Sequence, residues 1–350
     1  MTDRRFRALI SLSSLLVVTA CNDGDPIWAT RAAEDPLDNL PPPVSSPPAQ
    51  GSYVLLNSDV GDYIGAGEDY LYTKADSLIS VTASDAQLTV EIDGDEGWTG
   101  QFILPDTYAR LENGAYPNLT RYPFHDAIVG GLSWSGEGRG CNTLDGSLTI
   151  DTVTYDGDTL TDIGLSFEQY CEGDSPALRG QIRFDASDAT TPPGPVVPAP
   201  AGLWAPTQGS TPASDNYVYL VSEQDDFIGA GANYLYTDET ATITVEQTDG
   251  LLSVSVQGPE DWNGNFKGMN FLADLEEGYY GDLQRYPFQN PVKGGLSWSG
   301  EGRGCNRLTG WFAVDSVTYD AGAITAVDLR FEQHCEGNTP ALYGEIRWAQ

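Results

Sequence analysis

The chain has 350 residues, of which 40% are hydrophobic and 11% aromatic, so it can bury the cores of two ordinary domains. Its 51 Asp and Glu residues outnumber 17 Lys and Arg residues, which gives a formal net charge of -34 at pH 7. Such a surface repels phosphate backbones and anionic lipid headgroups, so we predict no nucleic-acid partner and a solvated, acidic exterior.

The first 21 residues have the features of a bacterial export signal. Three of the first seven residues are arginines, and the uncharged stretch that follows, residues 8–20, is too short to span a bilayer. This stretch leads into the run VTAC, closing at Cys21, which resembles the lipobox of bacterial lipoproteins. The resemblance implies cleavage before Cys21 and attachment there of diacylglycerol and an acyl chain such as palmitate.

Lipidation of Cys21 would place the protein in the bacterial cell envelope, outside the cytoplasm, with a membrane as partner through the N-terminal lipid. The sequence does not distinguish the outer from the inner membrane. The alternative interpretation is an ordinary secretory signal that happens to be followed by a cysteine.

The chain contains one domain twice. Residues 53–184 align with residues 217–348 without a gap, at a constant offset of 164, and the longest shared run, GGLSWSGEGRGCN, ends at Asn142 and Asn306. A period of this length indicates tandem domains and not a solenoid of short repeats. We therefore expect a signal peptide at 1–20, a proline-rich linker at 21–52, a first β domain (copy 1) at 53–185, a second proline-rich linker at 186–216 and a second β domain (copy 2) at 217–350.

Both linkers are rich in proline and should be extended, semi-stiff spacers. Trp204 in the second linker is an exception to this composition. An isolated tryptophan in a spacer often packs on a neighbouring domain, and we expect the same of Trp204.

Hydrophobic residues in each copy recur with a period of two, which is typical of half-buried strands. Leu88, Val90 and Ile92 alternate with polar residues, and their counterparts in copy 2 do the same. No stretch of either copy has the pattern of an amphipathic helix. The sequence predicts an all-β fold with about eight strands per copy, arranged as an antiparallel β-sandwich or jelly-roll-like domain.

Four cysteines remain once Cys21 is set aside, and they fall into pairs that are thirty residues apart. An even number of cysteines in an exported protein favours disulfides, so we predict Cys141–Cys171 and Cys305–Cys335. Metal binding is the alternative, but the chain has no C-x-x-C spacing and no histidine at matching positions in the two copies.

Comparison of the two copies also restricts which catalytic sites the domains can share. His125 aligns with Gln289 and His334 with Tyr170, so no histidine-based catalytic triad is common to both domains and no catalytic residue is predicted. We expect no cofactor, although the acidic turn at residues 93–97 and the trio Asp156, Asp158 and Asp162 make structural calcium in copy 1 a weaker alternative to plain polar turns.

Several glutamates are present in both copies and allow a second hypothesis, a glycoside hydrolase with paired carboxylates. The competing interpretation is that these acids face solvent or pair with nearby arginines such as Arg139. The six glutamates are Glu137, Glu168 and Glu172 in copy 1 and Glu301, Glu332 and Glu336 in copy 2.

An aromatic ring beside hydrogen-bonding side chains is a common means of holding sugar rings, and the glycine-rich loop of each copy offers this combination. The alternative is that its tryptophan belongs to the core and its arginine holds the loop. The candidate ligand-binding residues are Trp134, Glu137, Arg139, Asn142 and Tyr122 in copy 1 and Trp298, Glu301, Arg303, Asn306 and Tyr286 in copy 2.

The repeated pattern is similar to domains of uncharacterised secreted and surface proteins of bacteria, a resemblance that implies an extracytoplasmic location and no mechanism. Our leading hypothesis is a lipid-anchored binding or adhesion protein whose partner is a polysaccharide or a surface protein, with two tethered modules that gain avidity on a repetitive target. The alternatives are the hydrolase and a purely structural envelope protein.

Overall fold

The computed structural model describes residues 46–173, 176–213 and 215–350. The predicted signal peptide and the lipidation site Cys21 lie outside the described residues and stay predictions. Within the described ranges, no helix is long and apolar enough to cross a membrane.

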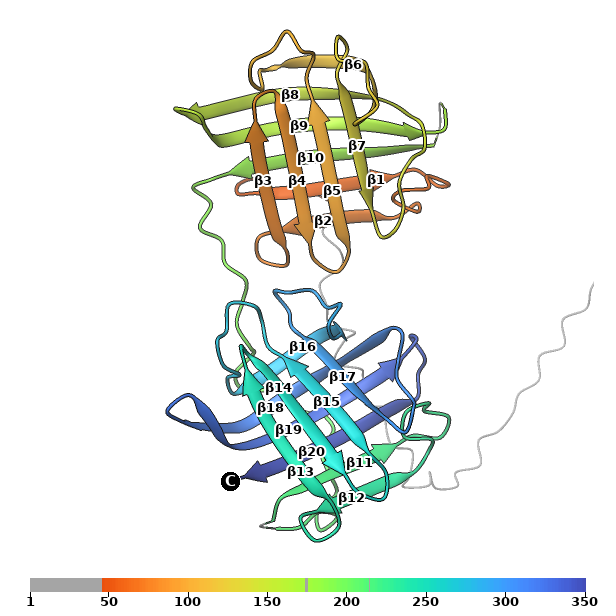
Figure 1. Cartoon of the computed structure of the whole chain (residues 1–350), viewed down its shortest axis with the longest axis vertical. Helices are drawn as coiled ribbons and strands as arrows, with labels where there is room; N and C mark the ends of the chain where they lie inside the picture. The colour runs from red at the N-terminus through yellow and green to blue at the C-terminus, as the bar shows by residue number, and fades with distance from the viewer. Residues whose placement is uncertain (1–45, 174–175, 214) are drawn as a thin grey trace, which may run out of the picture. The chain divides into compact units, whose positions relative to one another are not determined.

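Each copy is an all-β domain, as predicted (Figure 1). Copy 1 consists of β1 (Tyr53–Ser58), β2 (Asp69–Thr73), β3 (Leu78–Ser84), β4 (Gln87–Asp93), β5 (Gly97–Ile103), β6 (Gly114–Arg121), β7 (Gly131–Gly136), β8 (Leu144–Asp156), β9 (Thr159–Cys171) and β10 (Ala177–Asp185). Copy 2 consists of β11 (Tyr217–Ser222), β12 (Asn233–Thr237), β13 (Thr242–Thr248), β14 (Leu251–Gln257), β15 (Trp262–Lys267), β16 (Gly278–Arg285), β17 (Gly295–Gly300), β18 (Leu308–Asp320), β19 (Ala323–Cys335) and β20 (Ala341–Ala349).

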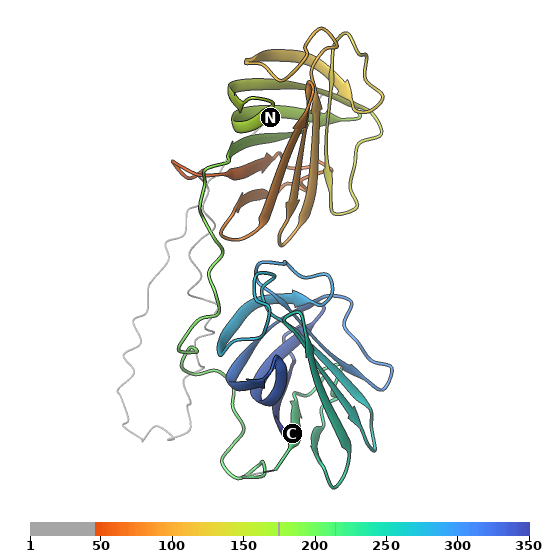
Figure 2. The ribbon, with the colours of Figure 1, turned by 60° about the vertical axis from the view of Figure 1, so that its left-hand side comes forward.

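The strands of copy 1 form one continuous ten-stranded sheet in the order β2-β1-β10-β9-β8-β6-β7-β5-β4-β3, and copy 2 repeats this order. All pairings are antiparallel except a two-residue parallel contact between β6 and β7. Figures 1 and 2 show that this sheet folds over on itself, so that β3, β4, β5 and β7 form one layer across a second layer that contains β8, β9, β10, β1 and β2. The result is a sandwich, and we call the second layer the back layer.

The prediction of about eight strands per copy was too low, because each copy has ten. The sequence signal is weakest in the short strand β2, with five residues. It is also weak in β6, where Pro117 interrupts the run and the register with β8 shifts between Tyr116 and Leu119. A proline and a bulge both break the period of two on which the count depended.

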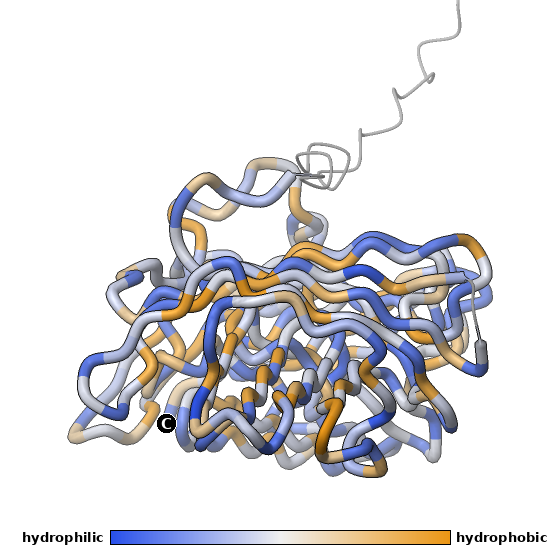
Figure 3. Tube along the Cα trace, turned by 90° about the horizontal axis from the view of Figure 1, so that it is seen from above, coloured by the Kyte–Doolittle hydropathy of each residue, from blue (hydrophilic) through white to orange (hydrophobic). Residues whose placement is uncertain are grey.

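The core of each copy lies between the two layers and is built from the inward-facing half of each strand. Trp98, Phe102 and Phe167 are among the buried side chains of copy 1. Figure 3 shows hydrophobic and hydrophilic residues alternating along much of the trace, which is the pattern that a two-layered β domain requires.

Both predicted disulfides are confirmed. Cys141 bonds to Cys171 with a Cα–Cα distance of 5.1 Å, and Cys305 bonds to Cys335 with a distance of 5.0 Å. In each copy the bond ties the glycine-rich loop to the end of a long strand, β9 or β19.

Part of the second linker lies on copy 2. Val196 forms an isolated β-bridge with Tyr279, and the ring of Trp204 stacks on Tyr343 with a centroid distance of 5.2 Å. Arg330 donates a 2.7 Å hydrogen bond from Nη1 to the carbonyl oxygen of Trp204. The expectation that Trp204 packs on a neighbouring domain is thus confirmed, and this stretch covers the outer face of the back layer of copy 2.

Candidate functional site

Four loops of each copy meet at one edge of the back layer, because their flanking strand ends are paired. In copy 1 the end of β1 pairs with the start of β10, and the end of β9 with the start of β8. The end of β6 also pairs with the start of β8. We call this side the loop edge, and its described loop residues are 59–68, 122–130, 137–143, 172–173 and 176 in copy 1 and 223–232, 286–294, 301–307 and 336–340 in copy 2.

At the loop edge of copy 1, an exposed phenylalanine ring makes a cation–π contact with an arginine. Phe124 is 76% exposed, and the guanidinium of Arg121 lies 5.1 Å from the centroid of its ring. Arg121 also donates from Nη1 to the carbonyl oxygen of Asn142, at 3.2 Å, in the glycine-rich loop. The arginine therefore connects the ring to the loop that carries the predicted binding residues.

Copy 2 repeats this arrangement with the same residue types. Phe288 is 72% exposed, and the guanidinium of Arg285 lies 5.2 Å from its ring centroid. Arg285 donates from Nη1 to the carbonyl oxygen of Asn306 at 3.4 Å. Both copies thus expose the same large apolar ring on the same arginine, outside their cores.

A second exposed aromatic ring lies in the loop that is hydrogen-bonded to the glycine-rich loop. Tyr63 in copy 1 is 59% exposed, and Phe227 at the matching position of copy 2 is 58% exposed. The carbonyl oxygen of the next residue, Ile64, accepts a 2.7 Å hydrogen bond from Nε of Arg139, and Arg303 makes the same bond in copy 2. In this way Arg139 and Arg303 hold the two loops together.

A buried aspartate fixes the loop that carries Tyr63. Asp62 is 3% exposed and accepts hydrogen bonds from the backbone N–H of Gly65 at 2.7 Å and from the hydroxyl of Ser58 at 2.8 Å. Asp226 makes the matching bonds in copy 2. The loop conformation is therefore determined by the protein before any ligand binds.

The interpretation of Trp134 and Trp298 as stacking platforms is wrong. Both residues are completely buried, and the Trp134 ring stacks on Phe167 at 5.2 Å. In β7 the side chain of Trp134 points inward together with that of Leu132, two positions earlier, because alternate residues of a strand share a face. The alternative interpretation, a core tryptophan, is the one that the structure supports.

The other predicted binding residues lie at the loop edge, where most of them hold the loops. Glu137 accepts a 2.9 Å hydrogen bond from the backbone N–H of Gly97, and Glu301 accepts the matching bond from Asp261. The ring of Tyr122 stacks on His125, and its hydroxyl contacts Gln87. Tyr286 is half-buried in the matching loop.

The glutamates of the hydrolase hypothesis already have protein partners. Glu172 accepts from the backbone N–H groups of Thr143 and Asn142, which lower the pKa of its carboxyl, and Glu336 has a lowered pKa for the same kind of reason. A general acid needs a raised pKa, so these two carboxyls are poorly suited to that role. Glu168 pairs with Arg179 at 2.7 Å, and Glu332 contacts His334 and Trp311.

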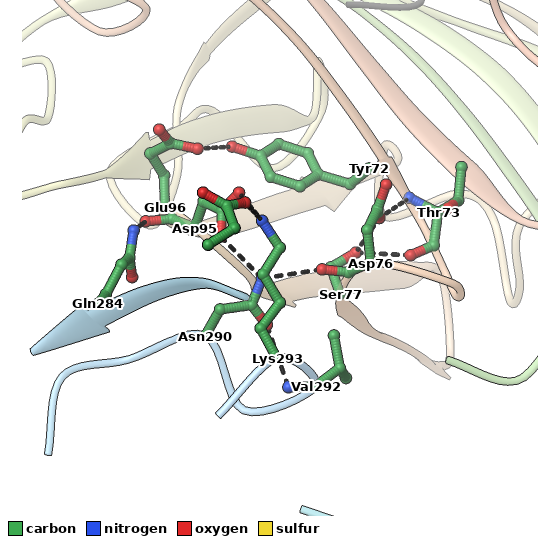
Figure 4. A network of polar contacts seen from close by, with 11 residues as sticks. Tyr72, Thr73, Asp76, Ser77, Asp95, Glu96, Gln284, Asn290, Val292 and Lys293 are labelled. Carbon is green, nitrogen blue, oxygen red and sulfur yellow. Dashed lines mark hydrogen bonds and ion pairs between the residues drawn. The ribbon is translucent and has the colours of Figure 1, made fainter. Parts of the chain in front are cut away.

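The acidic turn between β4 and β5 is occupied by hydrogen-bond donors (Figure 4). Glu96 accepts from the hydroxyl of Tyr72 at 2.7 Å, and burial raises the pKa of its carboxyl. Asp95 accepts from two residues of copy 2, Asn290 at 2.9 Å and Lys293 at 2.7 Å. In the part of the chain that the structure describes, no three His, Cys, Asp or Glu side chains are grouped to hold a metal ion.

Comparisons of the chain with protein-family models, with curated proteins and with solved structures found no match. The geometry of the site is therefore the basis for the functional inference. The residues that the sequence reasoning missed are Phe124, Phe288, Tyr63 and Phe227, and the signal for the first two was the run RYPF, which occurs in both copies.

Proposed function

We propose that the chain is an exported, lipid-anchored binding protein that holds polysaccharide at the loop edge of each β domain. The observation that carries this proposal is the exposed ring of Phe124 over Arg121, repeated by Phe288 over Arg285. A flat ring packs against the C–H face of a sugar, and neighbouring polar groups can bond to its hydroxyls.

Three further features support binding over catalysis. The loops are fixed in advance by Asp62 and Arg139 and their counterparts, which lowers the entropy cost of binding. Two sites on one chain suit a repetitive polymer, because the second contact becomes intramolecular. The acidic surface disfavours polyanionic partners, so we propose a neutral polysaccharide as the ligand.

The test is a glycan array probed with the full chain in detergent micelles. We expect saturable binding to one class of neutral glycan, and a clear loss of affinity for it in the double variant Phe124→Ala/Phe288→Ala. Phe271→Ala is the matched control, since Phe271 is 47% exposed in copy 2 but lies outside the loop edge. If the wild-type protein binds no glycan on the array, polysaccharide is rejected as the ligand, and a protein partner or a structural role is favoured.

A further inference from the structure

The outer face of the back layer differs between the two copies in a way that the repeated fold does not require. In copy 1 this face is hollowed and lined mainly by polar side chains. In copy 2 the linker lies across it. The polar side chains that line the hollow of copy 1 are Asn57, Ser147, Thr149, Ser166, Glu168, Arg179 and Gln181.

The strand register places these side chains in two rows that cross the strands. One row runs from Asn57 through Arg179 and Glu168 to Ser147. The other runs from Gln181 through Ser166 to Thr149. Neighbouring strands are about 4.8 Å apart, so the longer row spans about 14 Å, the length of two to three sugar rings.

Five of these side chains lack a hydrogen-bond partner among the described residues. Asn57, Ser147, Thr149, Ser166 and Gln181 make no side-chain hydrogen bond to any residue that the structure describes. Each carries a donor and an acceptor and no charge. The only charged groups in the hollow, Arg179 and Glu168, already pair with each other at 2.7 Å, and Arg179 pairs with Asp59 as well.

At the matching positions of copy 2, the chain supplies its own partners. Tyr343 takes the place of Arg179 and stacks on Trp204. Arg330 takes the place of Ser166, pairs with Asp315 at 2.6 Å and donates to the carbonyl oxygen of Trp204. The linker thus occupies in copy 2 the surface that, among the described residues, no segment covers in copy 1.

We propose that the outer face of copy 1 is a second binding site, which takes a neutral oligosaccharide across strands β1, β10, β9 and β8. Short uncharged donors and acceptors without a large exposed apolar group require a ligand that bonds in both directions, and sugar hydroxyls do so. Copy 2 has no such site, because the linker covers its face. The ligand class is that of the proposed function, on which this inference rests.

The test is hydrogen–deuterium exchange of the full chain in detergent, with and without neutral hexasaccharides of glucose and of N-acetylglucosamine. We expect protection of β8, β9 and β10 in copy 1 and none in β18, β19 and β20. Protection of the loop edges alone would overturn this inference and leave the proposed function standing. Protection of the copy 1 face alone would support the inference and reject the loop edge, and no protection anywhere would reject both.

A second test introduces into copy 1 the residue that copy 2 has at the matching position. Ser166→Arg should fill the hollow and pair with Asp151, just as Arg330 pairs with Asp315, so the fold should be kept. We expect it to weaken binding at this face about tenfold or more, because it removes hydrogen bonds and blocks access. Ser80→Arg, on the exposed edge strand β3, is the matched control, and equal affinity of the two variants would overturn the inference.

Discussion

Gly100 lies in β5 against the indole of Trp134, and one added methyl group there tests how the core of copy 1 is packed. A Cβ at Gly100 would lie 2.3 Å and 2.4 Å from two ring carbons of Trp134. The ring is completely buried and stacks on Phe167, so it cannot retreat without displacing its neighbours. We expect Gly100→Ala to lower the free energy of unfolding of copy 1 by about 1–3 kcal/mol.

The assay is urea unfolding at pH 7 with the disulfides intact, followed by circular dichroism. Gly140→Ala is the control, because its nearest contact would lie at 3.7 Å, and it should change the free energy by less than about 0.5 kcal/mol. Adding Trp134→Phe should recover part of the loss, since the smaller ring vacates the space. A neutral Gly100→Ala, or losses that simply add in the double variant, would refute the buried placement of Trp134.

Three further predictions concern individual contacts. Glu172 has a pKa below its ordinary value of 4.5. Its carboxylate therefore stabilises the fold above about pH 4.5, and this effect is lost as the pH falls through the folded pKa. Glu172→Gln should make the free energy of unfolding depend less steeply on pH at acid pH. Replacing Cys141 and Cys171 by Ser should cost copy 1 about 3–4 kcal/mol in urea unfolding, because the bond closes a thirty-residue loop. Trp204→Ala should cost copy 2 about 1–2 kcal/mol and leave the unfolding of copy 1 unchanged.

Each of these has a contradicting result. An unchanged acid slope in the Glu172 variant would mean that its hydrogen bonds to the loop backbone do not form in solution. Unfolding of copy 1 at the wild-type midpoint without the disulfide would refute the role given to that bond. An equal effect of Trp204→Ala on both copies would show that the linker does not pack on copy 2 alone.

The fold could be predicted from the sequence because its main signal is local. Alternation in segments such as residues 88–92 identifies strands, and the ungapped duplication fixes one architecture for both copies. The disulfides followed from cysteine number and spacing. The strand count was missed where the local signal fails, at the five-residue strand β2 and at the proline of β6.

The candidate site was harder to predict, because exposure in loops depends on tertiary contacts. Trp134 and Phe124 are both aromatic residues in or near glycine-rich loops, yet one is completely buried and the other is 76% exposed. The alternation of Leu132 and Trp134 along β7 was an available signal for burial. The polar hollow of copy 1 could not be predicted from the sequence, because it depends on the pairing of β1 with β10, which lie more than a hundred residues apart.

The central claim is that Phe124 and Phe288 each form part of a polysaccharide site. Isothermal titration calorimetry of the full chain with a neutral polysaccharide found on the array tests it most directly. We predict that either single alanine variant loses about a hundredfold in apparent affinity, through lost avidity, and that the double variant keeps only the weaker binding of the outer face of copy 1. Wild-type affinity in the double variant, with Phe271→Ala as the reference, would contradict the account.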